Sequence, residues 1–159
     1  MKPILLFYLL IASAGISSAQ IEPVGKDKVA LAGYDVVSYF KGNKAVKGNP
    51  EISKVLKGVI YYFSSNANRD LFAANPDSYL PQYDGYCALA IATQKRKVTI
   101  NPECFKVTEG KLYLFFNGAL PLVREKFNSL EPWVKDEATL IAKADTNWPK
   151  VKDVKRHVK

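Results

Sequence analysis

The stretch Gln82-Tyr83-Asp84-Gly85-Tyr86-Cys87-Ala88 places a cysteine directly after a Tyr/Gly-rich turn. Pro81 to Gly85 is rich in turn-forming residues, so we expect a loop there. An apolar run follows, and residues 86–93 are apolar enough to form a buried helix. The stretch therefore predicts a loop that delivers Cys87 to the start of a buried helix, and the segments on either side decide what that helix packs on.

Downstream, the clearest pattern is a β-hairpin. Residues 105–108 and 111–116 flank Glu109-Gly110, a pair that suits a tight turn between two strands. A short strand is expected at 97–100. Asn117 can cap a following helix, in which Pro121 falls in the first turn and apolar residues recur at helical spacing: Leu120, Val123, Phe127 and Leu130. A last helix is expected from Pro132 to about Trp148.

Upstream, a second pair of strands is expected at 52–56 and 59–63, with a turn at Lys57-Gly58 and a shorter strand at 44–47. Ser65 can cap a helix that runs to about Ala74, and Asp35 can cap a helical turn over 36–40. We find no internal repeat and no linker between large blocks. The pattern predicts a single α+β domain, a small antiparallel sheet with helices packed on it.

The first 19 residues have the pattern of a signal peptide. Lys2 supplies a positive start, residues 4–12 are apolar, and Ser17-Ser18-Ala19 offers small residues for cleavage after Ala19. The apolar run is too short for a comfortable membrane span, and no later stretch approaches one. We therefore expect an exported protein, periplasmic or secreted. Its parts are a flexible lead-in at 20–27, the domain at 28–149 and a basic tail at 150–159.

The chain of 159 residues has a net charge of +8, and much of that excess lies in the tail. Residues 150–159 hold five Lys or Arg side chains against Asp153. Such a tail is usually solvated, and it can make weak contact with an anionic surface. Nucleic acid is not expected as the partner of an exported protein.

Several segments, taken together, resemble the exported single-domain members of the YHS-domain family. The match runs through residues 28–149 and consists of these segments in chain order: Gly33-Tyr34-Asp35-x-Val37-x-Tyr39-Phe40, Tyr62-Phe63-Ser64-Ser65, Asn75-Pro76-x-x-Tyr79-x-Pro81-Gln82-Tyr83-x-Gly85-Tyr86-Cys87-Ala88, Gly110-Lys111-Leu112-Tyr113-Leu114 and Lys143-Ala144-Asp145-x-Asn147-Trp148-Pro149. The resemblance implies a small metal-handling module, with a copper or zinc ion as the suggested cofactor. Two departures stand out: Tyr62-Phe63-Ser64 replaces the Tyr-His-Ser signature, and Cys104 is an additional cysteine.

Cys87 and Cys104 are the two cysteines of the chain, and three interpretations of Cys87 stay open. It can be a buried apolar thiol, one half of a disulfide with Cys104 in an oxidising compartment, or a reactive thiol whose pKa is lowered at a helix start. The two thiolates are also candidate ligands for a soft metal ion. The one histidine, His157, lies in the basic tail, so a thiol or acid–base enzyme would lack its commonest partner. The sequence therefore favours a protein that is not an enzyme.

Tyrosine stands beside a carboxylate at Tyr34-Asp35 and again at Tyr83-Asp84. Phenol and carboxylate together can line a pocket for a small polar or cationic ligand, although buried tyrosines are more often core rings. The candidate ligand-binding residues are Tyr34, Asp35, Tyr39, Tyr83, Tyr86 and Cys87. We expect an exported binding protein whose small ligand or metal ion lies near Cys87. The alternatives are a thiol-based redox protein or enzyme acting through Cys87, and a structural or interaction module without a small ligand.

Overall fold

The strands of this protein form three separate antiparallel pairs. The computed structural model describes residues 20–120 and 125–155. In it β1 pairs with β2, β3 with β4, and β5 with β6; their bounds are β1 (Asn49–Leu56), β2 (Val59–Phe63), β3 (Asn101–Thr108), β4 (Lys111–Phe115), β5 (Asn117–Ala119) and β6 (Lys126–Asn128). With helices packed on these pairs, the predicted single α+β domain is confirmed, and its sheet is divided into three.

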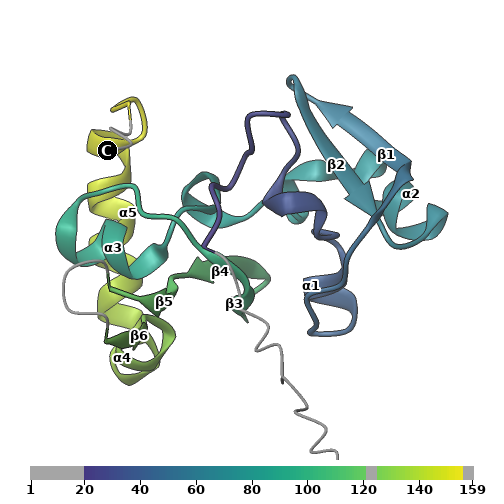
Figure 1. Cartoon of the computed structure of the whole chain (residues 1–159). Helices are drawn as coiled ribbons and strands as arrows, with labels where there is room; N and C mark the ends of the chain where they lie inside the picture. The colour runs from purple at the N-terminus through teal and green to yellow at the C-terminus, as the bar shows by residue number, and fades with distance from the viewer. Residues whose placement is uncertain (1–19, 121–124, 156–159) are drawn as a thin grey trace, which may run out of the picture.

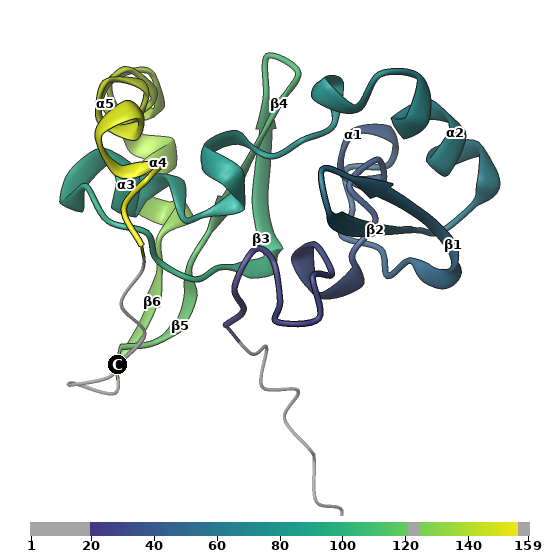
Figure 2. The ribbon, with the colours of Figure 1, turned by 90° about the horizontal axis from the view of Figure 1, so that it is seen from above.

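The helices fall into two groups around a central hairpin. Their bounds are η1 (Leu31–Gly33), α1 (Ser38–Lys41), α2 (Asn66–Ala74), η2 (Pro76–Ser78), η3 (Gln82–Gly85), α3 (Ala88–Gln94), α4 (Leu130–Lys135) and α5 (Glu137–Val151). Figure 1 shows α1 and α2 beside β1 and β2 on one side, and α3, α4 and α5 on the other. The view in Figure 2 keeps the same two groups apart, with β3 and β4 between them.

The chain contains an internal structural repeat, so our expectation of no repeat is wrong. The β1–β2 and β3–β4 hairpins have the same register at a constant offset of 52 residues, and each has an irregularity at the same place, after Asn49 and after Asn101. The offset also holds outside the hairpins. Val29 bridges Ile60 as Pro81 bridges Leu112, and the Asp35 N–H donates to Val46 O as the Cys87 N–H donates to Val98 O. Residues 29–64 and 81–116 are therefore two copies of one structural unit.

The two copies share residues mainly where the backbone is left-handed or turns, and most of their other residues differ. Three consecutive residues have left-handed φ in each copy, Leu31-Ala32-Gly33 at 47°, 49° and 80° and Tyr83-Asp84-Gly85 at 55°, 51° and 79°. Both hairpin turns are also left-handed, with Gly58 matching Gly110. Asn49-Pro50-Glu51 recurs as Asn101-Pro102-Glu103. Because identity is confined largely to such positions, the repeat is hard to see in the sequence.

Asp35 connects three segments of the first copy. Its side chain is 0 % exposed. Oδ1 accepts from the Val37 backbone N–H at 2.9 Å, while Oδ2 accepts from the backbone N–H and hydroxyl of Ser64 and from the amide of Asn68 at 2.6–2.9 Å. Asp35 thus caps the turn that leads into α1 and ties that turn to the end of β2 and to α2.

Each hairpin is covered by one helix through aromatic contacts. Phe72 of α2 packs on two rings of β2, and Trp133 of α4 packs on the two matching rings of β4, with centroid distances of 4.8–5.4 Å: Tyr61 and Phe63 in the first copy, Tyr113 and Phe115 in the second. Ser65 accepts from the Asn68 N–H at 3.1 Å, so the predicted cap of α2 is confirmed. The core is therefore built twice from the same aromatic pattern.

The helix that we predicted after Asn117 is wrong. This segment forms β5 and β6, in which Asn117 faces Asn128 and Gly118 faces Phe127. A Cβ atom on Gly118 would lie 2.8 Å from the side-chain amide of Gln20, so the N-terminal segment packs directly against this glycine. Pro121 and Val123 lie outside the described residues. Backbone pairing and this close approach override the helical spacing of the apolar residues.

The ends of the domain differ slightly from those predicted. Ile21 and Ile100 exchange two backbone hydrogen bonds and Pro23 is buried, so the first part of the expected lead-in, residues 21–23, packs on the body. The segments 44–47 and 97–100 form single bridges instead of strands. The last helix is interrupted at Asp136, and α5 continues to the buried Val151, beyond the expected boundary at 149. Residues 1–19 and His157 lie outside the described part of the chain.

Glu137, at the start of α5, ties that helix to β3 and α4. Its carboxylate accepts from Lys106 Nζ at 2.5 Å, from the Thr108 hydroxyl at 2.8 Å and from the Trp133 indole N–H at 3.0 Å. Burial alone would raise the pKa of Glu137, but these hydrogen bonds and the Lys106 charge lower it below its ordinary value.

We predict that Asp35→Ala lowers the free energy of unfolding by on the order of 3 kcal/mol, because donors from Val37, Ser64 and Asn68 lose their acceptor. Urea unfolding followed by circular dichroism measures this. Asp77→Ala removes an exposed carboxylate in η2 and serves as the matched control, with an expected change below about 0.5 kcal/mol. Equal stability of the two variants would contradict the role given to Asp35.

Acidification should also destabilise the protein through Glu137. A lowered folded-state pKa stabilises the native state above the ordinary pKa of about 4.3, and this contribution is lost as the pH falls through the folded value. Glu137→Gln should therefore flatten the stability profile in that acid range, whereas Glu131→Gln, at an exposed position of α4, should leave it unchanged. Urea midpoints measured from pH 7 to pH 3 test this, and parallel profiles for wild type and Glu137→Gln would contradict it.

Candidate functional site

The loop ahead of Cys87 has an unusual backbone that aims Asp84 outward. Tyr83, Asp84 and Gly85 of η3 all have positive φ, a conformation that costs roughly 1 kcal/mol for a residue with a side chain. A Cβ atom on Gly85 would lie 3.1 Å from Pro23 and 3.4 Å from Leu31, so η3 approaches η1 closely at this point. The result is that Tyr83 points into the core while Asp84 is exposed.

A cavity of about 400 Å³ lies where the two copies meet. Its volume is within the range of small-molecule sites. The apolar wall comes from the N-terminal segment, η1 and the β1–β2 hairpin, including Val24, Leu31 and Leu56. The polar groups on its lining are Lys57, Tyr61, Asp84, Tyr86 and Lys97. Residues from both copies are therefore needed to form this cavity.

Two phenols share the neighbourhood of the Asp84 carboxylate. The pKa values of Tyr61 and Tyr86 are both raised, first by burial and then by the negative charge of Asp84. Among the described residues the ion pairs are Arg69 with Asp70 and Lys106 with Glu137, so Asp84 has no ion-pair partner there. Asp84, which has no ion-pair partner among the described residues, thus lines the same cavity as the two phenols.

The two lysines of the lining are placed differently. Lys97 donates from Nζ to the carbonyls of Lys152 and Val154, the latter at 3.0 Å, and its ammonium also lies 5.4 Å from the centre of the Tyr86 ring. Its charge is therefore held at the end of α5. Lys57 stands in the exposed turn between β1 and β2.

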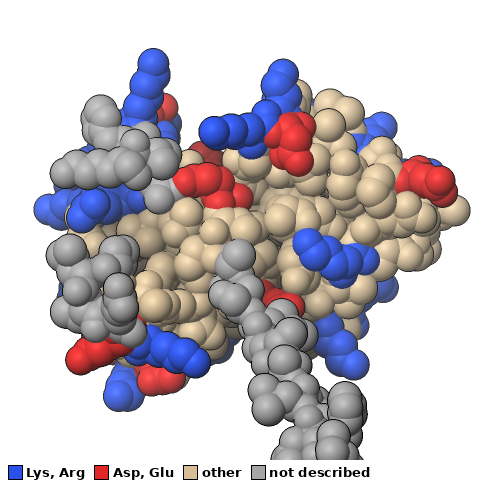
Figure 3. All heavy atoms as spheres, viewed as in Figure 1, with Lys and Arg blue, Asp and Glu red and all other residues tan. Residues whose placement is uncertain are grey.

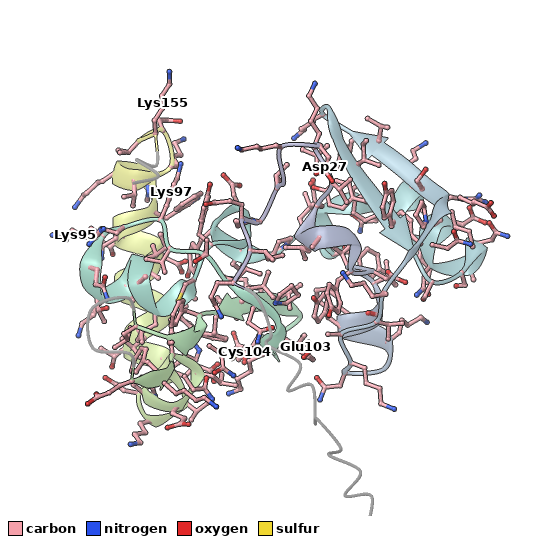
Figure 4. All side chains as sticks on the ribbon, viewed as in Figure 1. Asp27, Lys95, Lys97, Glu103, Cys104 and Lys155 are labelled. Atoms are coloured by element: carbon pink, nitrogen blue, oxygen red, sulfur yellow. The ribbon has the colours of Figure 1, made fainter. Side chains whose placement is uncertain are left out.

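The predicted residues Tyr34, Asp35 and Tyr39 do not reach this cavity. The Tyr34 hydroxyl donates to Glu103 at 3.0 Å, and the Lys47 ammonium lies 4.1 Å from the centre of its ring. Tyr39 is 0 % exposed, and its hydroxyl donates to Pro102 O at 2.9 Å. Burial raises the pKa of both phenols. Figure 4 shows Glu103 between the two groups of elements, so these tyrosines join the two copies to each other.

Of the loop residues predicted for the site, the structure brings Tyr86 to the cavity and turns Tyr83 away. Tyr83 donates to Asp145 at 2.9 Å and packs against Trp148 of α5 at a centroid distance of 5.9 Å. Asp84, which we named as the partner of a tyrosine, lines the cavity. Tyr61 was missed; its place in a strand of tyrosines and aliphatic residues suggested only core packing.

Both cysteines are buried in the core, and neither lines the cavity. Cys87 is 1 % exposed and is the N-cap residue of α3, as predicted, and its Sγ lies 3.3 Å from Ser129 Oγ. Cys104 is 5 % exposed and donates to the side chain of Asn128 at 3.2 Å. Burial and then the neighbouring Cys87 raise the pKa of Cys104 to about 11, which disfavours its thiolate at neutral pH.

The thiols are free in the structure, and a bridge between Cys87 and Cys104 stays a prediction. Within residues 20–120 and 125–155, no group of three or more His, Cys, Asp or Glu side chains gathers as metal ligands would. The two thiols alone therefore remain as the candidate copper or zinc ligands.

Several basic side chains lie at the α3–α5 end, and one of them, Lys97, also lines the cavity. Figure 3 shows Lys and Arg over that side of the molecule, and Figure 4 places Lys95, Lys97 and Lys155 there. Weak contact of this end and of the basic tail with an anionic surface stays a prediction.

Comparisons with known proteins give no further identification, since no family model, curated protein or solved structure matches this chain. In the part of the chain that the structure describes, no helix is both long and apolar enough to cross a membrane.

The burial of the two thiols predicts their reactivity. A thiol-specific reagent should detect close to no thiol in the native protein and two after denaturation without reductant, since both side chains are then exposed. Cys87→Ser should leave one. No thiol in either state would establish the disulfide instead, and fast reaction of the native protein would contradict the buried positions.

Proposed function

We propose that this chain is an exported YHS-like binding module that is not an enzyme, with its small-ligand site in the cavity between the two copies. The observation that carries the proposal is the cavity itself, about 400 Å³, whose lining combines an apolar wall with one carboxylate, two phenols and two lysines. Binding sites for small molecules have this composition, apolar walls with a few convergent polar groups. Tyr86 precedes Cys87, so the site lies beside the residue near which we expected it.

The condition of the two cysteines supports a binding role over a redox role. A thiol that reacts with a substrate must be reached by it and must ionise near neutral pH. Cys87 is 1 % exposed, and the pKa of Cys104 is raised to about 11. These observations also favour the cavity over the thiols as the place where a ligand is held.

Blocking the cavity should abolish binding. Val24 lines the cavity and is 41 % exposed, so Val24→Trp can fill the space without disturbing the core. Val55→Trp adds the same ring at a position that is 60 % exposed and outside the lining, and is the matched control. A fragment library screened by ligand-observed NMR should give hits with wild type and Val55→Trp that weaken at least about tenfold with Val24→Trp.

The proposal fails if the library gives no hits, or if the hits bind Val24→Trp and wild type equally well. Thermal melting of both Trp variants confirms that they remain folded before the comparison is made.

A further inference from the structure

The internal repeat shows what kind of group covers the second copy of the cavity wall. Leu31 and Tyr61, which line the cavity, correspond to Tyr83 and Tyr113 in the second copy. There α5 closes the surface: the Trp148 ring lies 5.9 Å from Tyr83, and Asp145 accepts the Tyr83 hydroxyl at 2.9 Å. Tyr113, whose ring packs on Tyr83 and on Trp133 of α4, is 2 % exposed, whereas Tyr61 is only partly buried.

In the first copy, Leu31 is itself 1 % exposed, and the part of the equivalent surface that stays partly open is formed by Leu56 and Tyr61. The chain passes from α2 through η2 directly into the second copy, and the wall formed by Leu31, Leu56 and Tyr61 faces the cavity. Since the chain itself places an indole ring on the matching surface, a planar aromatic group is the occupant whose shape suits this wall. Aromatic rings gain both from apolar burial and from offset or edge contacts with a neighbouring tyrosine.

The negative charge of Asp84 on the cavity lining favours a ligand whose polar end is positively charged. Asp84 has no ion-pair partner among the described residues, and it lines the cavity together with the phenols of Tyr61 and Tyr86. A carboxylate beside aromatic rings attracts an ammonium group through a charge-assisted hydrogen bond and cation–π contact. Lys97 does not compete for Asp84, because its ammonium is bonded to Lys152 and Val154 at the end of α5. Lys57 lies in an exposed turn, where water screens its charge.

We propose that the cavity binds a small aromatic amine, with its ring against Leu56 and Tyr61 and its ammonium at Asp84. The inference rests on the proposed function, because it assigns a ligand class to the same cavity. Carboxylic acids and neutral compounds with the same ring lack the positive charge that would pair with the Asp84 carboxylate.

Three indoles with different side-chain ends separate the effects of ring and charge. They are tryptamine with an ammonium, tryptophol with a hydroxyl and indole-3-propionate with a carboxylate, each titrated into the purified protein by calorimetry at pH 7. We expect tryptamine to bind about tenfold more tightly than tryptophol and indole-3-propionate to bind most weakly, as a charge-assisted hydrogen bond predicts. Asp84→Asn should remove the preference for tryptamine, and it retains a residue that tolerates positive φ.

Asp77→Asn, at an exposed site in η2, is the matched control and should keep the tenfold preference. Equal affinity for all three indoles, each lost in Val24→Trp, would overturn the amine assignment and leave the cavity as the binding site. Failure of every indole to bind, while other fragments bind in a Val24-dependent way, would overturn the aromatic amine alone. Tryptamine binding that survives Val24→Trp would overturn both proposals.

Discussion

The buried carboxylate of Asp35 is the interaction on which the arrangement of the first copy depends. A charged group without solvent is costly unless hydrogen bonds replace its water, and here donors from Val37, Ser64 and Asn68 do so. These donors belong to the turn before α1, the end of β2 and the helix α2. The same carboxylate therefore fixes η1 against the β1–β2 hairpin, and through it the position of Leu31 relative to Tyr61 in the cavity wall.

In the second copy, the position equivalent to that of Asp35 holds an uncharged side chain. Cys87 takes the position of Asp35, and its Sγ contacts the hydroxyl of Ser129. In the chain, Ser129 follows the β5–β6 hairpin and does not follow β4 directly. A neutral thiol is easily desolvated, and it does not need strong hydrogen-bond partners when it is buried. The extra hairpin and the long helix α5 can therefore be accommodated in this copy, while the polar network of the first copy confines its surroundings more tightly.

Much of the secondary structure is predictable from the sequence, because helix caps and turn residues act over only a few neighbouring positions. Ser65 before an amphipathic segment predicts α2, and glycine at Gly58 and Gly110 predicts the two main hairpins. The failures come from long-range contacts. The residues after Asn117 have helical spacing, yet they pair with 126–128 and lie against Gln20. The repeat was missed because the sheet pairing and the left-handed turns, which define it, leave few identical side chains.

Of the residues that the sequence singled out for a site, one loop lines the cavity and several tyrosines do not. The motif Asp84-Gly85-Tyr86 is visible as a turn with a carboxylate and a phenol, and its Asp84 and Tyr86 line the cavity. Tyr34 and Tyr39 look equivalent in sequence, but the packing of one copy on the other directs them to Glu103 and Pro102. Tyr61 lines the cavity only because η1 and η3 come together beside the β1–β2 hairpin. No local sequence pattern predicts this long-range contact.

The position of α5 also has a consequence for stoichiometry. A protein made of two equivalent units would ordinarily offer two equivalent sites, and saturation at two ligands per chain. Here Trp148 and Asp145 already occupy the surface over Tyr83 in the second unit, so that surface is taken by the chain's own helix. The duplication thus leaves a single such surface for the proposed ligand, because the other is filled by the chain's own helix.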